Sequence, residues 1–236
     1  MNTSDSTGPH PHSHGGQPVK HAGAPLGVAD AAVVLLHGRG ATATSILDLG
    51  DAFYTHGVAL VAPQASYNRW YPDSFLAPRK RNEPDLSSAL STVEEVVTAV
   101  ASHLPLNRIV VGGFSQGACL AAEYVARNPR RYGGLVVLSG GLIGPMGTTF
   151  EYTGDLDGTP VFVGSSDVDP YIPVERVHET RAVFERLGGR VTERIYENAA
   201  HTVTDDEVAF VGDLLASLVA DSAGEPGHDA PAGDER

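Results

Sequence analysis

The sequence predicts an α/β domain with a mostly parallel central sheet and helices on both faces. Short runs rich in Val, Ile and Leu alternate with longer segments whose apolar residues recur at helical spacing. The run Ala31–Leu36 is apolar throughout, which is typical of a strand covered on both sides. With 236 residues, 42% of them hydrophobic, the chain is long enough to bury one sizeable core, so a single domain is expected.

Both ends of the chain lie outside this alternation. Residues 1–18 are rich in Ser, Thr, Gly, Pro and His without an apolar period, and residues 222–236 are acidic, so both are expected to be disordered tails. The folded α/β domain is therefore expected to span residues 19–221. The first tail holds three alternating histidines, His10, His12 and His14. They favour either a metal-binding tract or a solvated segment, and we prefer the second because ligands without a fold make a loose site.

The first half of the domain is expected to hold an edge strand and two central strands. The edge strand and a turn fall within residues 19–30, and the strands at 31–36 and 59–65 enclose a helix over 44–55. An irregular stretch, 66–84, then carries three large aromatic residues, Trp70, Tyr71 and Phe75. A long loop after a strand is often functional. These aromatics therefore either contact a substrate or pack the loop.

The second half repeats the alternation. Asp85 or Ser87 is expected to cap a helix that Pro105 stops. The further strands are expected at 109–111, 134–138, 160–164 and 191–196, and the further helices at 116–128, 174–187 and 205–220. The stretch 140–159 has glycines but no convincing helix, so any lid over the site is minimal.

A nucleophile motif joins the strand at 109–111 to the helix after it. Residues 113–117 read Gly-Phe-Ser-Gln-Gly, and a G-x-S-x-G sequence between a strand and a helix holds its serine on a strained turn above the sheet edge. The motif alone is weak, and an ordinary turn that happens to contain Ser115 is the alternative. The strand–turn–helix context favours Ser115 as a nucleophile.

A serine hydroxyl needs a base, and the base needs a carboxylate to orient it. Of the ten histidines, His201 directly follows the last strand and precedes the last helix, so it is the expected base. Asp167 and Asp169 both follow the strand at 160–164, and their spacing does not decide between them. The order serine, acid, histidine is that of an α/β-hydrolase.

Two backbone N–H groups are expected to stabilise an oxyanion. One belongs to Gln116 at a helix start, and the other to Arg39 in the glycine-rich loop at 37–40. The Arg39 side chain is expected either to meet an anionic group of the substrate or to be solvated.

Composition excludes several other classes of function. The net charge of −13 argues against nucleic acid and anionic membrane surfaces as partners. No apolar run reaches the roughly 20 residues of a membrane span, and the N-terminus has no signal pattern, so a cytoplasmic location is expected. The single cysteine, Cys119, is expected to be a buried structural thiol.

With these residues placed, the chain resembles the phospholipase/carboxylesterase group of α/β-hydrolases, which includes the acyl-protein thioesterases. The resemblance spans roughly residues 19–220. It rests on the motifs at 36–40 (LHGRG), 62–65 (APQA), 112–117 (GGFSQG), 139–142 (SGGL) and 167–170 (DVDP) with Ile172-Pro173, together with His201.

The resemblance implies roles that spacing leaves open. The catalytic acid of the group is the aspartate before the proline, which is Asp169 here, and its second oxyanion donor is the residue after His-Gly, which is Arg39. The group usually has glycine before its histidine, where this chain has Ala200. The stretch 68–72 and the loop of Arg39 are more similar to the bacterial carboxylesterase or dienelactone-hydrolase-like branch than to the protein thioesterases. True dienelactone hydrolases use cysteine, so Ser115 argues against that activity.

The sequence thus predicts a serine carboxylesterase for small to medium acyl esters, without metal or organic cofactor. The resemblance implies a homodimer, for which the sequence indicates no interface. The same machinery would serve an acyl thioesterase or lysophospholipase, and a non-catalytic binding module on a hydrolase fold is the alternative of another class. The substrate is expected to contact the residues of the oxyanion loop and the aromatic stretch, with one further residue after 139–141: His37, Gly38, Trp70, Tyr71, Phe75 and Leu142.

Overall fold

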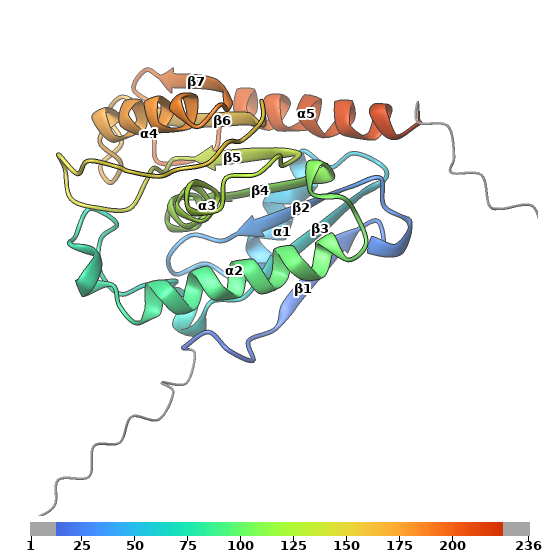
Figure 1. Cartoon of the computed structure of the whole chain (residues 1–236), viewed down its shortest axis with the longest axis horizontal. Coiled ribbons are helices and arrows are strands. Elements are labelled where there is room, and N and C mark those ends of the chain that lie inside the picture. Colours follow the sequence, from blue (N-terminus) through green and yellow to red (C-terminus); the bar gives the residue numbers. More distant parts are fainter. Residues whose placement is uncertain (1–12, 224–236) are drawn as a thin grey trace, which may run out of the picture.

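A twisted sheet of seven strands runs through the middle of the protein (Figure 1), which we describe from a computed structural model over residues 13–223. The strands are β1 (Val19–Gly23), β2 (Ala31–Leu36), β3 (Val58–Pro63), β4 (Ile109–Phe114), β5 (Gly134–Leu138), β6 (Pro160–Ser166) and β7 (Arg190–Tyr196). Their order is β1-β3-β2-β4-β5-β6-β7. Only β1 pairs antiparallel, at the edge, so the predicted mostly parallel α/β sheet is confirmed.

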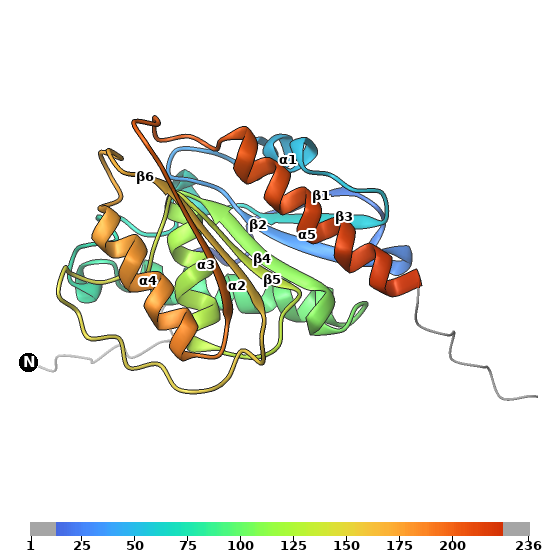
Figure 2. The same cartoon turned by 90° about the horizontal axis from the view of Figure 1, so that it is seen from above.

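Five helices cover the two faces of the sheet. They are α1 (Ala43–Ala52), α2 (Asp85–Ala101), α3 (Gln116–Arg127), α4 (Val174–Arg186) and α5 (Asp205–Ala223). Figure 2 shows α1 and α5 on one side and α2, α3 and α4 on the other. None of these helices is long and apolar enough to span a bilayer.

The strand β2 shows why a continuous apolar run predicts a central strand. Its six residues are all buried. Ala32, Val34 and Leu36 face the core under α2, α3 and α4, whereas Val33 and Leu35 face the core under α1 and α5. Because successive side chains point to opposite faces, a strand covered on both sides must be apolar throughout.

The sheet order fixes where a site can lie. The chain winds outward in one direction from β2 to β3 and in the other from β4 to β7, so β2 and β4 flank the switch point. Open α/β sheets bind ligands at such a point, above the carboxyl ends of the strands. The register pairs Leu36 with Gly113, which sets the loop after β2 against the turn after β4.

The folded part of the chain begins before the boundary that composition suggests. Residues 13–18 are described by the structure, and His14 among them is only 3% exposed. Its Nδ1 accepts a hydrogen bond from the Ser66 N–H at 3.1 Å, and its Nε2–H donates to the Trp70 carbonyl at 2.9 Å. Both ring nitrogens are therefore occupied by backbone groups rather than available to a metal. His10 and His12 lie outside the described residues.

The last helix is slightly longer than predicted. It continues to Ala223, whereas the sequence predicts a helix that ends at residue 220 and an acidic tail from residue 222. The Ser222 hydroxyl donates to Asp30 Oδ1 at 2.9 Å, so this end of α5 is tied to the turn before β2.

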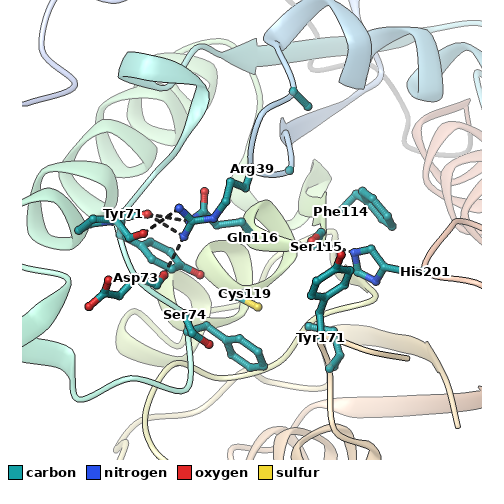
Figure 3. Close-up of a pocket in the computed structure, with 15 residues that line it drawn as sticks. Arg39, Tyr71, Asp73, Ser74, Phe114, Ser115, Gln116, Cys119, Tyr171 and His201 are labelled. Carbon is teal, nitrogen blue, oxygen red and sulfur yellow. Dashed lines mark hydrogen bonds between the residues drawn. The ribbon is translucent and has the colours of Figure 1, made fainter. Parts of the chain in front are cut away.

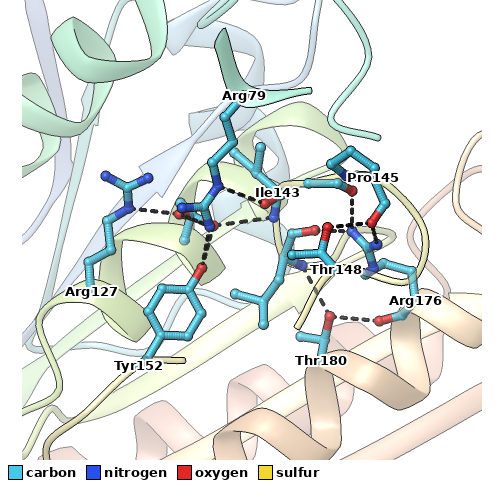
Figure 4. A network of polar contacts seen from close by, with 11 residues as sticks. Arg79, Arg127, Ile143, Pro145, Thr148, Tyr152, Arg176 and Thr180 are labelled. Carbon is cyan, nitrogen blue, oxygen red and sulfur yellow. Dashed lines mark hydrogen bonds and ion pairs between the residues drawn. The ribbon is translucent and has the colours of Figure 1, made fainter. Parts of the chain in front are cut away.

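The stretch 139–159 contains no helix, as expected for a minimal lid. A buried carboxylate, Glu123 of α3, holds one side of it (Figure 4). Glu123 pairs with Arg79 and Arg127, each at 2.7 Å, and accepts hydrogen bonds from the Ile143 N–H and the Tyr152 hydroxyl. The two arginines compensate the buried charge that would otherwise be costly.

A buried arginine, Arg176 of α4, holds the other side of the same stretch. Its guanidinium donates to the carbonyl oxygens of Leu142, Gly144 and Pro145 at 2.6–2.8 Å (Figure 4). It also lies over the ring of Phe75, with its Cζ 5.9 Å from the ring centroid. These hydrogen bonds therefore hold the segment in place rather than leaving it as a free flap.

Candidate active site

The turn between β4 and α3 brings three backbone segments closer than side chains would allow. A Cβ atom on Gly117 would lie 2.0 Å from the Leu36 carbonyl oxygen, and one on Gly113 would lie 2.5 Å from the same oxygen. Only glycine fits both positions. Ser115 between them has φ 54° and ψ −118°, an unusual conformation for a residue with a side chain. Such strain is typical of functional turns.

The structure places the side chains of Ser115, His201 and Asp169 in one hydrogen-bonded row. Ser115 Oγ lies 2.9 Å from His201 Nε2, and His201 Nδ1 lies 2.6 Å from Asp169 Oδ2. The Asp169 side chain is fully buried, and that of His201 is 15% exposed. Figure 3 shows the imidazole facing the serine. With Asp169 ionised, Nδ1–H donates to it and Nε2 is left free to accept the Ser115 proton.

The two aspartates after β6 have different partners. Asp169 uses Oδ1 to accept the N–H groups of Tyr171 and Ile172, at 2.8 and 3.1 Å, so its other oxygen is aimed at His201. Asp167 accepts the Asn198 N–H at 2.8 Å and so ties the loop after β6 to the loop after β7. The structure thus places Asp169, and not Asp167, against the imidazole.

The loop after β2, residues 37–40, is called the oxyanion loop below. A buried histidine within it, His37, sets its orientation. Its Nδ1–H donates to the Gly38 carbonyl at 2.8 Å, and its Nε2 accepts the Ala65 N–H at 3.1 Å. The Gly38 carbonyl also accepts the Ala41 N–H at 3.1 Å. The Arg39 N–H belongs to the same trans peptide unit as that carbonyl and points the opposite way. Fixing the carbonyl therefore fixes the direction of the Arg39 N–H.

The second expected donor is the Gln116 N–H in the first turn of α3. The first N–H groups of a helix have no partner within it, and the helix dipole favours negative charge there. Ser115 is the N-cap residue of this helix, and the Cys119 N–H is bonded to its carbonyl at 3.0 Å. A nascent oxyanion above Ser115 would therefore meet a positive helix end.

The side chains of Arg39 and Gln116 hold the stretch 66–84, which we call the aromatic loop. The Arg39 guanidinium donates to the carbonyl oxygens of Tyr71, Pro72 and Asp73 at 2.7–3.0 Å (Figure 3). The Gln116 amide accepts from the Trp70 N–H and donates to the Tyr71 carbonyl, both at 2.9 Å. Arg39 is exposed, but its guanidinium is thus engaged by the carbonyls of residues 71–73. No pattern in the sequence predicts this clamp.

Two cavities meet at His201, which lines both of them. The large cavity, of about 690 Å³, is lined from the oxyanion loop, the aromatic loop, the nucleophile turn and the loop after β6 by Gly38, Arg39, Ala41, Tyr71, Pro72, Asp73, Ser74, Phe75, Phe114, Ser115, Gln116, Cys119, Tyr171, Ile172 and His201. The small cavity, of about 320 Å³, is lined by His37, Gly38, Ala41, Ser45, Ile46, Leu49, Phe114, His201, Thr202 and Val203.

Four of the six residues expected to contact substrate line these cavities. Gly38, Tyr71 and Phe75 line the large cavity and His37 the small one. Trp70 and Leu142 line neither. Trp70 is fully buried, with its indole N–H donating to the His37 carbonyl at 2.8 Å, and the Leu142 backbone is held by Arg176. Sequence reasoning missed Tyr171 and Ile172, although both directly follow the aspartate and proline of the motif at 167–170.

The buried end of the large cavity carries neutral groups. Burial raises the pKa of the Cys119 thiol to about 12 and the pKa of the Tyr71 hydroxyl well above its usual value. Cys119 is therefore a protonated buried thiol, as the sequence predicts, and offers no competing thiolate. The Tyr71 hydroxyl lies against the Cys119 thiol.

Comparison with known proteins agrees with this geometry. The model of the phospholipase/carboxylesterase family matches residues 24–219, which is most of the chain. The chain belongs to this family. The resemblance and the α/β-hydrolase fold expected from the motifs are thereby confirmed.

Individual members of the family differ in how closely they match. A crystal structure of a phospholipase/carboxylesterase from Dyadobacter fermentans is 41% identical with a TM-score of 0.81, over 85% of this chain and 96% of that one. Acyl-protein thioesterase 1 of Candida albicans is 32% identical over 121 residues, and the chain spans only 52% of its length. A carboxylesterase from Bacillus cereus, 21% identical with a TM-score of 0.69 over 88% of this chain and 97% of that one, shares the fold.

This member of the family is expected to lose stability in mild acid through His37. Burial lowers the pKa of His37 below its usual 6.5, outweighing the hydrogen bond to Gly38, which raises it. The unfolded chain therefore binds a proton at a higher pH than the folded chain. The stability contribution is complete above pH ~6.5 and falls as pH drops from there toward the lowered pKa.

Urea unfolding at about pH 7.5 and about pH 5.5 measures this effect. The free energy of unfolding of His37→Gln is expected to fall less between the two pH values than that of the wild type, because the other histidines titrate in both proteins. An equal fall in both would show that His37 does not contribute.

The guanidinium clamp gives a second prediction for this family member. Arg39→Ala keeps the backbone N–H but releases the carbonyls of residues 71–73, so kcat/KM for an ester is expected to fall about 10-fold to 100-fold through misplacement of the cavity wall. The exposed Arg69 lies in the same loop and provides the control, Arg69→Ala, which is expected to stay near the wild-type value. Equal rates for Arg39→Ala and the wild type would mean that the clamp does not shape the site.

Proposed function

We propose that the protein is a serine carboxylesterase that hydrolyses small to medium acyl esters through an acyl-serine intermediate. One observation carries the proposal. The row formed by Ser115, His201 and Asp169 opens directly onto the large cavity, whose volume of about 690 Å³ lies in the range of small-ligand sites. Tyr71, Phe75 and Ile172 give that cavity apolar walls suited to an acyl chain.

Acylation begins when Ser115 Oγ attacks the ester carbonyl carbon. His201 Nε2 takes the hydroxyl proton as the new C–O bond forms, and Asp169 stabilises the resulting imidazolium. The negative charge moves to the former carbonyl oxygen, where the N–H groups of Arg39 and Gln116 donate to it. The intermediate collapses as the alcohol oxygen takes the proton from Nε2 and leaves.

Deacylation repeats these steps with water as the nucleophile. His201 accepts a proton from the water, whose oxygen bonds to the acyl carbon. The bond between this carbon and Ser115 Oγ then breaks, and Oγ recovers the proton from Nε2. The carboxylic acid is released, and no metal or organic cofactor takes part in any step. The neutral form of His201 is the one that accepts protons.

An acyl thioesterase is the second candidate, supported by the name of the Candida albicans relative. A thioester passes through the same tetrahedral intermediate, so the triad does not discriminate, and a lysophospholipid is a further variant of the same chemistry. We prefer compact esters because the stretch 139–159 is held by Arg176 and forms no helix that would cover a long acyl chain.

The test compares p-nitrophenyl esters from acetate to dodecanoate with the acyl-CoA thioesters of the same acids. We expect hydrolysis of the esters with an optimum at short or medium chain length. A preference for the thioesters would favour the second candidate. Labelling by a serine-directed fluorophosphonate, located by mass spectrometry, is expected at Ser115. Absence of both turnover and labelling would reject the enzyme and favour a binding module on a hydrolase fold.

Two further expectations from the sequence stay predictions. A homodimer would appear in analytical ultracentrifugation as twice the mass of the chain, and a monomer there would contradict it. The cytoplasmic location is tested by fractionating cells that express the protein.

A further inference from the structure

The small cavity lies beside the proposed acyl site, on the face of the sheet that carries α1 and α5. Helix α1 contributes Ser45, Ile46 and Leu49, and the loop before α5 contributes Thr202 and Val203. Four residues line both cavities: Gly38, Ala41, Phe114 and His201. The two cavities are therefore neighbours, and the oxyanion loop and the imidazole form the boundary between them.

The reaction gives each substituent of the carbonyl carbon a different requirement. The oxygen must face the Arg39 and Gln116 N–H groups. The acyl group stays bonded to Ser115 between the two half-reactions, so its cavity must open onto Ser115, as only the large one does. The leaving oxygen must reach His201 Nε2 to collect its proton. The small cavity borders His201 and the two residues that follow it.

We propose that the small cavity binds the alcohol part of the ester, and that it accepts uncharged apolar alcohols; this inference rests on the proposed esterase function. Ile46, Leu49, Val203 and the Phe114 ring supply apolar walls. The lining contains no Asp, Glu, Lys or Arg, so it offers no partner for a charged headgroup. A volume of about 320 Å³ is at the lower end for ligand sites, which suits a compact alcohol.

A further activity follows from this assignment. An alcohol held in the small cavity is placed to attack the acyl-Ser115 carbonyl in place of water. His201 Nε2 takes the hydroxyl proton as the alcohol oxygen bonds to carbon, the bond from carbon to Oγ breaks, and Oγ recovers the proton. The products are a new ester and free Ser115, so the protein acts as an acyltransferase to alcohols.

The first test fills the small cavity with Leu49→Trp and measures two substrate series. For acetates from ethyl to hexyl, the ratio of kcat/KM for the hexyl ester to that for the ethyl ester is expected to fall at least about tenfold. For ethyl esters from acetate to hexanoate, the preference for acyl length is expected to stay unchanged. Leu90→Trp is the matched control, because Leu90 is a partly buried helix residue that lines neither cavity.

The second test measures how acyl-Ser115 divides between water and alcohol. The protein is given p-nitrophenyl acetate with added 1-butanol, and butyl acetate and acetate are quantified. The ratio of butyl acetate to acetate is expected to fall several-fold in Leu49→Trp. It is expected to fall likewise in Thr202→Trp, whose residue is exposed and so tolerates bulk without affecting folding.

The outcomes separate this inference from the proposed function. Wild-type protein that cleaves no ester would remove the esterase function itself. Cleavage with an alcohol preference and a partition ratio unchanged in both tryptophan variants would overturn the assignment of the small cavity alone. A change in acyl preference without a change in alcohol preference would reverse the two cavities and also overturn it.

Discussion

Ser115→Ala is expected to lower kcat for p-nitrophenyl ester hydrolysis by about a millionfold, close to the limit of detection. The variant loses the only atom that can carry the acyl group, whereas His201, Asp169 and both N–H donors remain. Cα and Cβ keep their places, so the strained turn is preserved and thermal unfolding is expected to change little. Initial rates with the purified variant, and the mass of the intact protein during turnover, check both points.

The control for this variant is another serine of the same cavity. Ser74 lines the large cavity, and within residues 13–223 the hydrogen bond of its Oγ is the one it accepts from the N–H of Leu76 at 3.1 Å. Ser74→Ala is expected to stay within a few-fold of the wild-type rate. A Ser115→Ala protein that is folded and still hydrolyses the ester at the wild-type rate would place the reaction elsewhere.

Asp169→Asn is expected to lower kcat by about 10⁴-fold while leaving the fold intact. The asparagine amide donates to Nδ1 of His201, which then carries its proton on Nε2. That tautomer cannot accept the Ser115 proton. The lost carboxylate also no longer stabilises the imidazolium that forms in the transition state. Rates of ester hydrolysis, compared with those of the wild type at equal protein concentration, measure the loss.

The neighbouring aspartate supplies a matched control for charge and position. Asp167→Asn removes the same charge two residues away, but Asp167 contacts the Asn198 N–H instead of His201. Its kcat is expected to fall by less than about tenfold, since the side-chain oxygen of asparagine can still accept that hydrogen bond. Comparable losses in the two variants would mean that the net charge of the loop, and not contact with His201, sets the rate.

These two aspartates also show what spacing alone leaves open, because only the family resemblance pointed to Asp169. The apolar strands and the glycines around Ser115 follow from periodicity and close approach, so the fold and the sheet edge of the site could be predicted. Asp167 and Asp169 follow the same strand and differ only in the turn that each makes. Hydrogen bonds from the N–H groups of residues 171 and 172 orient Asp169, and those bonds depend on three-dimensional turn geometry that spacing does not contain.

The residues around the cavities were harder to predict for a different reason. Residues 66–84 have no period, so nothing in the sequence tells which aromatic side chain faces the cavity and which faces the core. Tyr71 and Phe75 face the cavity, but Trp70 packs inside.

His14 lies in a stretch whose composition resembles a solvated tail, and its ring is held by two backbone partners more than 50 positions away in the sequence.

The position of Trp70 gives the protein a built-in fluorescent probe. It is the only tryptophan in the chain. Its ring contacts the imidazoles of His14 and His37, at centroid distances of 5.6 and 5.0 Å, and its backbone N–H donates to the side-chain oxygen of Gln116. Its emission therefore comes from one place, where the N-terminal segment, the oxyanion loop and the nucleophile turn meet. Spectral changes on acylation or acidification would report on that junction without any label.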